Sequence, residues 1–157
     1  MQPQSPDWLD WIFNHPPFLV LVFIAAWGST LYVIGMISGW VLLSERFRLK
    51  DSFYGKTLPF RSARMRFYCQ YNNCLTVGAD ESGLYVAVFP LFRVGHPPLL
   101  IPWSEVSVIS GESGLIFKKR ELRLGRNESI PFRISASLAE TLQRWAGKTW
   151  PIESIAV

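Results

Sequence analysis

Residues 18–43 read FLVLVFIAAWGSTLYVIGMISGWVLL, a run of 26 residues with no charged side chain. As one helix this run would be about 39 Å long, against a bilayer hydrocarbon core of about 30 Å. A soluble helix of this length keeps a polar face, whereas only Ser29, Thr30 and Ser38 interrupt this run. We therefore predict a transmembrane helix over residues 18–43 rather than a buried helix of a soluble protein.

The residues before this run decide whether it is an anchor or a cleaved signal. A signal peptide has a basic start and an apolar core of about 7–15 residues. Here residues 1–17 are acidic, with Asp7 and Asp10, and the apolar run is much longer. We predict a retained anchor, preceded by an extracytoplasmic segment with a short interfacial helix in residues 5–14. Trp8, Trp11 and Trp40 are expected in the headgroup layers at the two ends of the span.

The net charge of +4 is distributed unevenly along the chain. Residues 1–43 carry −2, residues 44–66 carry +5 and residues 67–157 carry +1. Basic residues favour the cytoplasmic side of a membrane segment, so we predict an outside N-terminus and a cytoplasmic C-terminal domain. Because that domain is nearly neutral, nucleic acid is not an expected partner. The bilayer is.

The second half of the apolar run contains closely spaced glycines. Gly35 and Gly39 have the small-xxx-small spacing that lets two membrane helices approach closely, and Gly28 lies farther back in the same run. Gly28, Gly35 and Gly39 are therefore a candidate helix-packing face for self-association or for another membrane protein.

After the membrane segment the pattern changes twice. Residues 44–64 form a basic juxtamembrane linker that is expected to lie along the headgroups. From residue 65 apolar and polar residues alternate with a period of two, which indicates short strands separated by turns. The expected strands are residues 65–71, 74–77, 84–89, 99–103, 106–110, 115–124 and 130–134.

The period returns to 3.6 near the C-terminus. Ser137 and Glu140 have the spacing of a capping box, and Gly147 is a typical helix end. We predict one amphipathic helix between them and a tail at residues 149–157. A small open sheet would leave edges and one exposed apolar face, so a barrel capped by this helix is favoured. The predicted fold class is α+β: one transmembrane helix, then a small antiparallel barrel over residues 65–148.

Two short segments carry a resemblance to a known superfamily. Residues 83–86 read GLYV, and residues 100–106 read LIPWSEV before the next predicted strand. With the strand order and the single final helix, they resemble the pleckstrin-homology-like (PH-like) superfamily, in particular its bacterial membrane-tethered and GRAM-like members. The resemblance implies a PH-like barrel and a place in the bacterial cytoplasmic (inner) membrane. The layout is also similar to that of uncharacterised bacterial membrane proteins.

The residues that could carry catalysis or bind metal are few. His15 and His96 are expected on opposite sides of the membrane, and Cys69 and Cys74 do not have zinc-knuckle spacing. No glycine-rich phosphate loop and no Gly-x-Ser-x-Gly motif is present. We therefore predict no enzyme activity, no metal site and no cofactor.

Two basic features are candidate contacts with anionic lipids. They comprise Arg46, Arg48 and Lys50 after the span, and Lys118 and Arg120 on a predicted hairpin. For the hairpin the alternative is a solvated edge, where lysine blocks aggregation.

The loop of residues 93–98 is unusually rich in proline. Arg93, His96, Pro97 and Pro98 are its candidate partner-docking residues, because prolines lower the cost of ordering a loop on binding. The alternative is a connection that packs its leucines into the barrel.

Together these observations predict a non-enzymatic single-pass membrane protein that presents an interaction or scaffold domain at the inner leaflet. The alternative is a small accessory subunit of a larger integral membrane complex.

Overall fold

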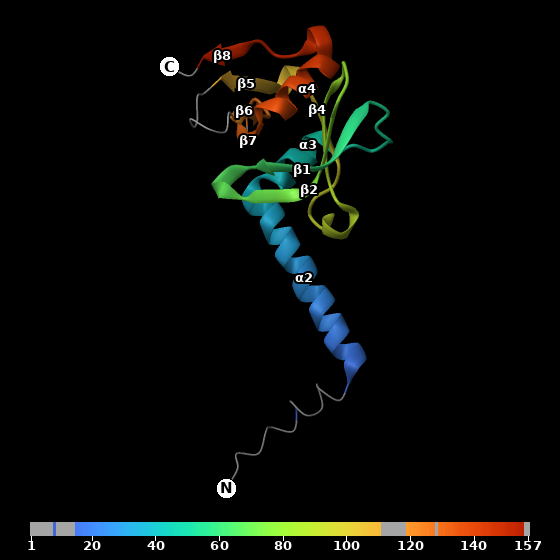
Figure 1. Ribbon diagram of the computed structural model, residues 1–157. Helices are drawn as coiled ribbons and strands as arrows, with labels where there is room; N and C mark the ends of the chain where they lie inside the picture. The colour runs from blue at the N-terminus through green and yellow to red at the C-terminus, as the bar shows by residue number, and fades with distance from the viewer. Residues whose placement is uncertain (1–7, 9–14, 111–118, 128, 156–157) are drawn as a thin grey trace.

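One long helix projects from a barrel-like domain (Figure 1). The computed structural model describes residues 8, 15–110, 119–127 and 129–155. The projecting helix is α2 (Pro16–Ser38), and a short helix, α3 (Trp40–Phe47), follows it directly. The third described helix, α4 (Ala136–Ala146), lies near the end of the chain. α2 is long and apolar enough to cross a membrane.

The barrel is one sheet in the order β4-β3-β2-β1-β7-β6-β5-β8. Its first seven strands pair antiparallel and nearly close on themselves, and β8 adds to β5 in parallel. This confirms the α+β class with an apolar N-terminal helix, an antiparallel barrel and a C-terminal helix. The strands are β1 (Lys56–Arg64), β2 (Gln70–Ala79), β3 (Gly83–Val88), β4 (Leu99–Pro102), β5 (Val106–Ser110), β6 (Lys119–Leu124), β7 (Ile130–Ser135) and β8 (Glu153–Ile155).

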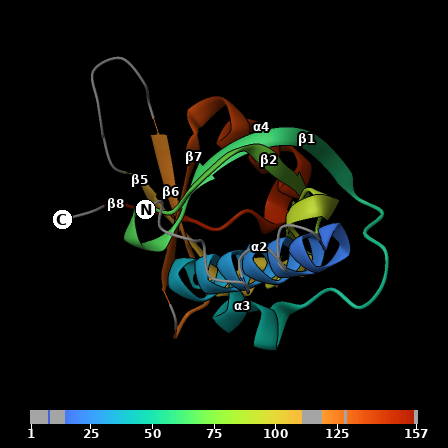
Figure 2. The same cartoon turned by 90° about the horizontal axis from the view of Figure 1, so that it is seen from below.

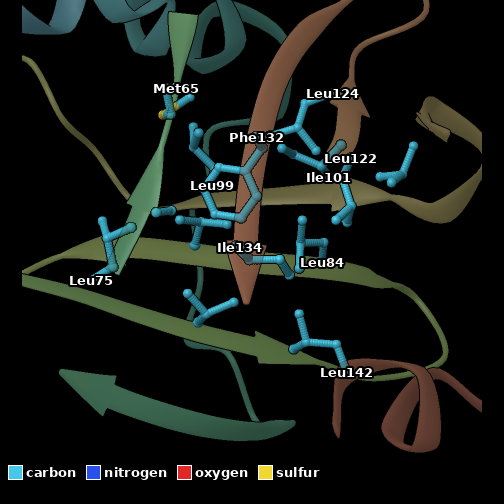
Figure 3. Packing of buried hydrophobic residues seen from close by; sticks show 14 of the residues in the cluster. Met65, Leu75, Leu84, Leu99, Ile101, Leu122, Leu124, Phe132, Ile134 and Leu142 are labelled. Atoms are coloured by element: carbon cyan, nitrogen blue, oxygen red, sulfur yellow. The ribbon is translucent and has the colours of Figure 1, made fainter. Parts of the chain in front are cut away.

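The hydrophobic core fills the inside of this barrel (Figure 3). Alternation along β7 buries Ile130, Phe132 and Ile134 and leaves the residues between them more exposed, as a period of two requires. α4 contributes Leu138 and Leu142 and packs against β2, β6 and β7. The core therefore joins both halves of the sheet to the C-terminal helix.

The cap of α4 differs from the predicted one. Ser135, not Ser137, is the N-cap residue, and its hydroxyl accepts a hydrogen bond from the Leu138 backbone N–H. The predicted end is close, since α4 stops at Ala146 and Gly147 follows with φ 59°. The helix begins earlier because β7 runs into it without a loop.

The predicted transmembrane helix over residues 18–43 is broken in the structure. α2 ends at Ser38, and Gly39 adopts φ 85°, a left-handed conformation that favours glycine. The chain then turns into α3, whose Trp40 and Leu43 are fully buried in the barrel core. Trp40 therefore lies inside the domain, not in the headgroup layer.

The predicted linker of residues 44–64 and the predicted strand of residues 65–71 are also corrected. The linker contains the second half of α3 and all of β1, while residues 66–68 form a 3-10 turn, η1, in which Phe67 has φ 52°. The domain thus starts near Trp40 rather than at residue 65. Only Ala63 of β1 is buried, so this strand lacks the alternation that would have revealed it.

The predicted turn at Asn72-Asn73 lies inside β2. Here the pairing of β1 with β2 shifts register twice, and Asn73 has φ 49°. The Ser62 hydroxyl accepts from the Asn73 backbone N–H at 2.9 Å, which holds the irregularity in place. The residues that predicted a turn therefore form a β-bulge within β2.

Three sequence predictions fall outside the described residues: most of the interfacial helix at 5–14, the turn at 111–114 and the start of the strand at 115–124. By contrast, the predicted turn before β3 is confirmed. There Asp80 Oδ1 accepts from the Ser82 backbone N–H at 2.8 Å.

Gly39→Ala tests the break between α2 and α3. A Cβ at Gly39 would lie 2.6 Å from Ile130 Cδ1, in addition to the cost of a left-handed backbone. We expect this variant to lower the free energy of unfolding by about 2 kcal/mol or more, measured by thermal unfolding in detergent. Gly147→Ala is the matched control, since Gly147 has positive φ and, beyond its chain neighbours, no atom of the described residues lies within 4 Å of its Cβ position. Equal losses in the two variants would contradict a packing role for Gly39.

Candidate functional site

The candidate site is the place where the apolar helix joins the barrel. Three segments far apart in sequence meet there: the end of α2, the start of β2 and the loop of residues 93–98. We call this region the helix–barrel junction and define it by Ser38, Trp40, Tyr71 and His96. All four side chains are buried.

Trp40 fixes the start of α3 to the loop. Its Nε1–H donates to the Pro97 carbonyl oxygen at 2.8 Å. Its ring centroid lies 5.6 Å from that of Tyr71 and 5.3 Å from that of His96. An indole buried this deeply needs a partner for its N–H, and the loop carbonyl provides one.

A chain of hydrogen bonds runs through the junction beside Trp40. The Tyr71 hydroxyl oxygen lies 2.9 Å from Ser38 Oγ and 2.9 Å from His96 Nε2. His96 Nδ1 lies 2.9 Å from the Val94 carbonyl oxygen. Since a carbonyl only accepts, Nδ1 carries the proton of the neutral ring, and Nε2 lies within hydrogen-bond distance of the Tyr71 hydroxyl, which donates to Ser38 Oγ. The side chains of Ser38, Tyr71 and His96 therefore all have hydrogen-bond partners despite their burial.

Burial also sets the charge of these groups. It lowers the pKa of His96 below its usual value of 6.5, although the bond to the Val94 carbonyl opposes this. Burial likewise raises the pKa of the Tyr71 phenol above its usual value, so the hydroxyl keeps its proton. The junction is thus neutral at pH 7, as an apolar interior requires.

The glycines of the predicted helix-packing face lie against the chain's own domain. A Cβ at Gly35 would be 2.7 Å from the Gly95 carbonyl oxygen, and one at Gly39 would meet Ile130. Gly28 faces Val94 more loosely, at 3.9 Å. A second membrane helix would therefore have to displace the domain to use Gly35 and Gly39. Close backbone approach occurs here, between a helix and a loop.

The predicted docking loop is largely engaged within the chain. His96 is buried, Pro97 accepts from Trp40, and the Pro98 carbonyl accepts from the Leu49 backbone N–H at 2.9 Å. Arg93 is the exposed member, with its Nε 3.4 Å from the Val88 carbonyl oxygen. Docking of a partner through Arg93 stays a prediction. The alternative interpretation of the loop holds in part, because Leu99 is buried in the barrel core whereas Leu91 is 64% exposed.

The candidate lipid-contact residues lie on separate elements. Arg46 of α3 is 4.0 Å from Glu105, and its guanidinium carbon lies 5.3 Å from the centroid of the Phe47 ring. Arg48 and Lys50 follow α3 and are exposed. Arg120 lies on β6, paired with Ile134 of β7. Lys118 falls outside the described residues. The predicted lipid contacts remain predictions.

The cysteines carry no sign of a metal site. Cys69 and Cys74 are free, half-buried thiols, and burial raises the pKa of both. Over residues 15–110, 119–127 and 129–155, no three His, Cys, Asp or Glu side chains are grouped so that they could hold a metal ion.

Ser38 and Tyr71 were not expected to belong to a site. The available signal was weak: Ser38 is one of three polar residues in the apolar run, and it directly precedes Gly39 and Trp40. Tyr71 was expected on a half-buried strand, where a phenol needs no special explanation.

In comparisons with known proteins, no family model matches this chain, and no curated protein and no solved structure matches it.

His96→Gln tests the neutral state of the junction. Because the folded pKa is lowered, the unfolded chain binds a proton near pH 6.5 that the folded chain does not. The lowered pKa of His96 therefore makes the folded state less stable as the pH falls below 6.5. Between pH 6.5 and the folded pKa, the free energy of unfolding decreases by at most about 1.4 kcal/mol per pH unit. We expect His96→Gln to reduce the loss of stability between pH 7.5 and 5 in thermal unfolding.

His15→Gln is the control for this measurement, because His15 lies at the far end of α2. We expect it to keep the pH dependence of the unmodified chain. The same slope in all three proteins would show that His96 is not buried in its neutral form.

Proposed function

We propose that this chain is a non-enzymatic single-pass membrane protein that holds an interaction or scaffold domain in a fixed orientation at the membrane. The observation that carries the proposal is the helix–barrel junction. There the continuation of the apolar helix becomes part of the barrel core through Trp40 and Leu43.

The exposure of α2 supports membrane insertion. The helix has 23 residues and is therefore about 35 Å long, enough for a hydrocarbon core of about 30 Å. Most of its apolar side chains are exposed, including Leu21, Phe23 and Ile24. A core helix of a soluble protein would bury such a surface, whereas lipid tails cover it at no cost.

The direct connection from α2 to the barrel supports a fixed orientation. No flexible linker separates them, since Gly39 alone lies between the end of α2 and the start of α3. The loop of residues 93–98 then contacts both α2 and α3. A domain held in this way presents the same face at the same height above the bilayer. Such an arrangement suits the recruitment or alignment of a partner at the membrane.

The barrel and its interior support a PH-like, non-catalytic domain. The order of elements, with seven antiparallel strands before one C-terminal helix, supports this part of the proposal. His96, the histidine of this domain, is occupied by Tyr71 and Val94 within a buried junction. Its role is therefore structural.

The charge distribution supports a cytoplasmic position of the barrel, and the resemblance places the proposed membrane in bacteria. The +5 segment of residues 44–66 directly follows α2, whereas the residues before α2 carry only acidic charges. The accessory-subunit alternative receives less support, because Gly35 and Gly39 already pack within the chain.

Paired C-terminal fusions test the proposed orientation. Green fluorescent protein fluoresces only when it folds in the cytoplasm, whereas alkaline phosphatase is active only outside it. We expect the first fusion to fluoresce and the second to be inactive, with both retained in membranes after an alkaline wash. An active phosphatase fusion would contradict the orientation, and release by the wash would contradict the membrane anchor.

A further inference from the structure

The connection between β3 and β4 descends along the side of α2 instead of staying with the barrel (Figures 1 and 2). Its turn η2 (Pro90–Phe92) places the Phe92 ring centroid 5.8 Å from that of Trp27. Val94 faces Gly28, and Gly95 touches the backbone of Tyr32 and the position of Gly35. Residues 89–95, which we call the β3–β4 wedge, therefore cover α2 from Trp27 to Gly35.

The outer surface of this wedge is apolar. Phe89 is 46% exposed, Leu91 is 64% exposed and Val94 is 49% exposed. Three large apolar side chains gathered within six residues on an exposed turn form a patch of the kind that is typical of a protein or membrane contact. The position of the wedge against α2 indicates what that is.

The height of the bilayer on α2 follows from the exposed side chains of the helix. Val33, Met36 and Ile37 are 49%, 54% and 47% exposed, and they lie at or above the level of the wedge. The part of α2 below the wedge, Pro16–Trp27, would be only about 18 Å long, well short of a hydrocarbon core of about 30 Å. The span must therefore include the residues that the wedge covers.

We infer that the β3–β4 wedge is inserted into the bilayer beside α2, in the leaflet nearest the barrel. Phe89, Leu91 and Val94 contact lipid there. This inference rests on the proposed membrane anchor, and it adds a second membrane contact that the sequence did not indicate. The barrel is then held by two elements, which fixes its rotation about the helix axis as well as its height.

The backbone of the wedge is suited to this environment. Irregular backbone is tolerated at membrane depth where its polar groups are satisfied against protein. Phe92 N–H donates to the Phe89 carbonyl at 2.8 Å, and His96 N–H donates to the Arg93 carbonyl at 2.8 Å. Pro90 has no N–H to satisfy. The long Arg93 side chain can carry its charge toward the headgroups.

Spin labels on the full-length chain in phospholipid vesicles test the inference. Single cysteines replace residues in a Cys69→Ala, Cys74→Ala background whose unfolding temperature is first matched to that of the unmodified chain. Leu91→Cys reports on the wedge, Val22→Cys on the free half of α2, and Ile152→Cys on the barrel, where the side chain is 93% exposed. Collisions with oxygen, which partitions into lipid, are compared with collisions with a water-soluble nickel chelate.

We expect the oxygen-to-nickel ratio at positions 91 and 22 to be several-fold higher than at position 152. A high ratio at position 22 with a water-like ratio at position 91 would overturn the wedge and leave the anchor standing. A water-like ratio at position 22 would overturn the anchor, and with it the inference.

A second measurement uses the unmodified chain, so that it does not depend on the folding of the cysteine variants. Vesicles contain a phospholipid with a photoreactive group at the end of its acyl chain, and trypsin is added after illumination. Cleavage after Arg66 and Arg93 yields residues 67–93, and cleavage after Lys148 yields residues 149–157. We expect lipid adducts on residues 89–92 and none on residues 149–157. Adducts on α2 without adducts on residues 89–92 would contradict the inference.

Discussion

The structure depends on one constraint, which is that an apolar helix must turn into a barrel core without a linker. Gly39 makes this possible, because its left-handed backbone ends α2 and its missing side chain leaves room for Ile130. The turn delivers Trp40 and Leu43 into the core, where both are fully buried. The same chain continues along the edge of β4, where Arg48 pairs with Leu99. An edge strand that would otherwise be open is thereby covered.

The polar groups of the junction make this arrangement specific. Burying Ser38, Tyr71 and His96 without partners would cost about 1–3 kcal/mol each, whereas their mutual bonds satisfy them only in one relative position of α2, β2 and the loop. Apolar packing alone would allow the helix to shift or rotate. The neutral His96 ring therefore fixes the position of α2 relative to the barrel. The loop that carries His96 also contains the apolar turn that lies along α2.

The sequence predicted the parts of the fold that follow from regular patterns. The charge-free run, the β-prone apolar stretch of β3, the alternation in β5 and β7, and the amphipathic C-terminal helix are all local patterns. β1 was missed because its side chains are mostly exposed, and the kink was missed because Gly39 stood inside an unbroken apolar run. The junction could not be predicted, since it joins residues 38, 71 and 96 through tertiary contacts. Gly35 was identified as a close-packing position, but its neighbour is Gly95 of the same chain.

The central claim is that helix and barrel form one rigid unit. The most direct test is the distance distribution between spin labels at Val22→Cys on α2 and Ser107→Cys on β5, in vesicles and in a background without Cys69 and Cys74. The reference is a pair within the barrel, Thr57→Cys and Ser107→Cys. A rigid junction predicts one narrow distribution, as narrow as that of the reference pair. A broad or multiple distribution for the helix–barrel pair alone would show a hinge at Gly39 and contradict the account.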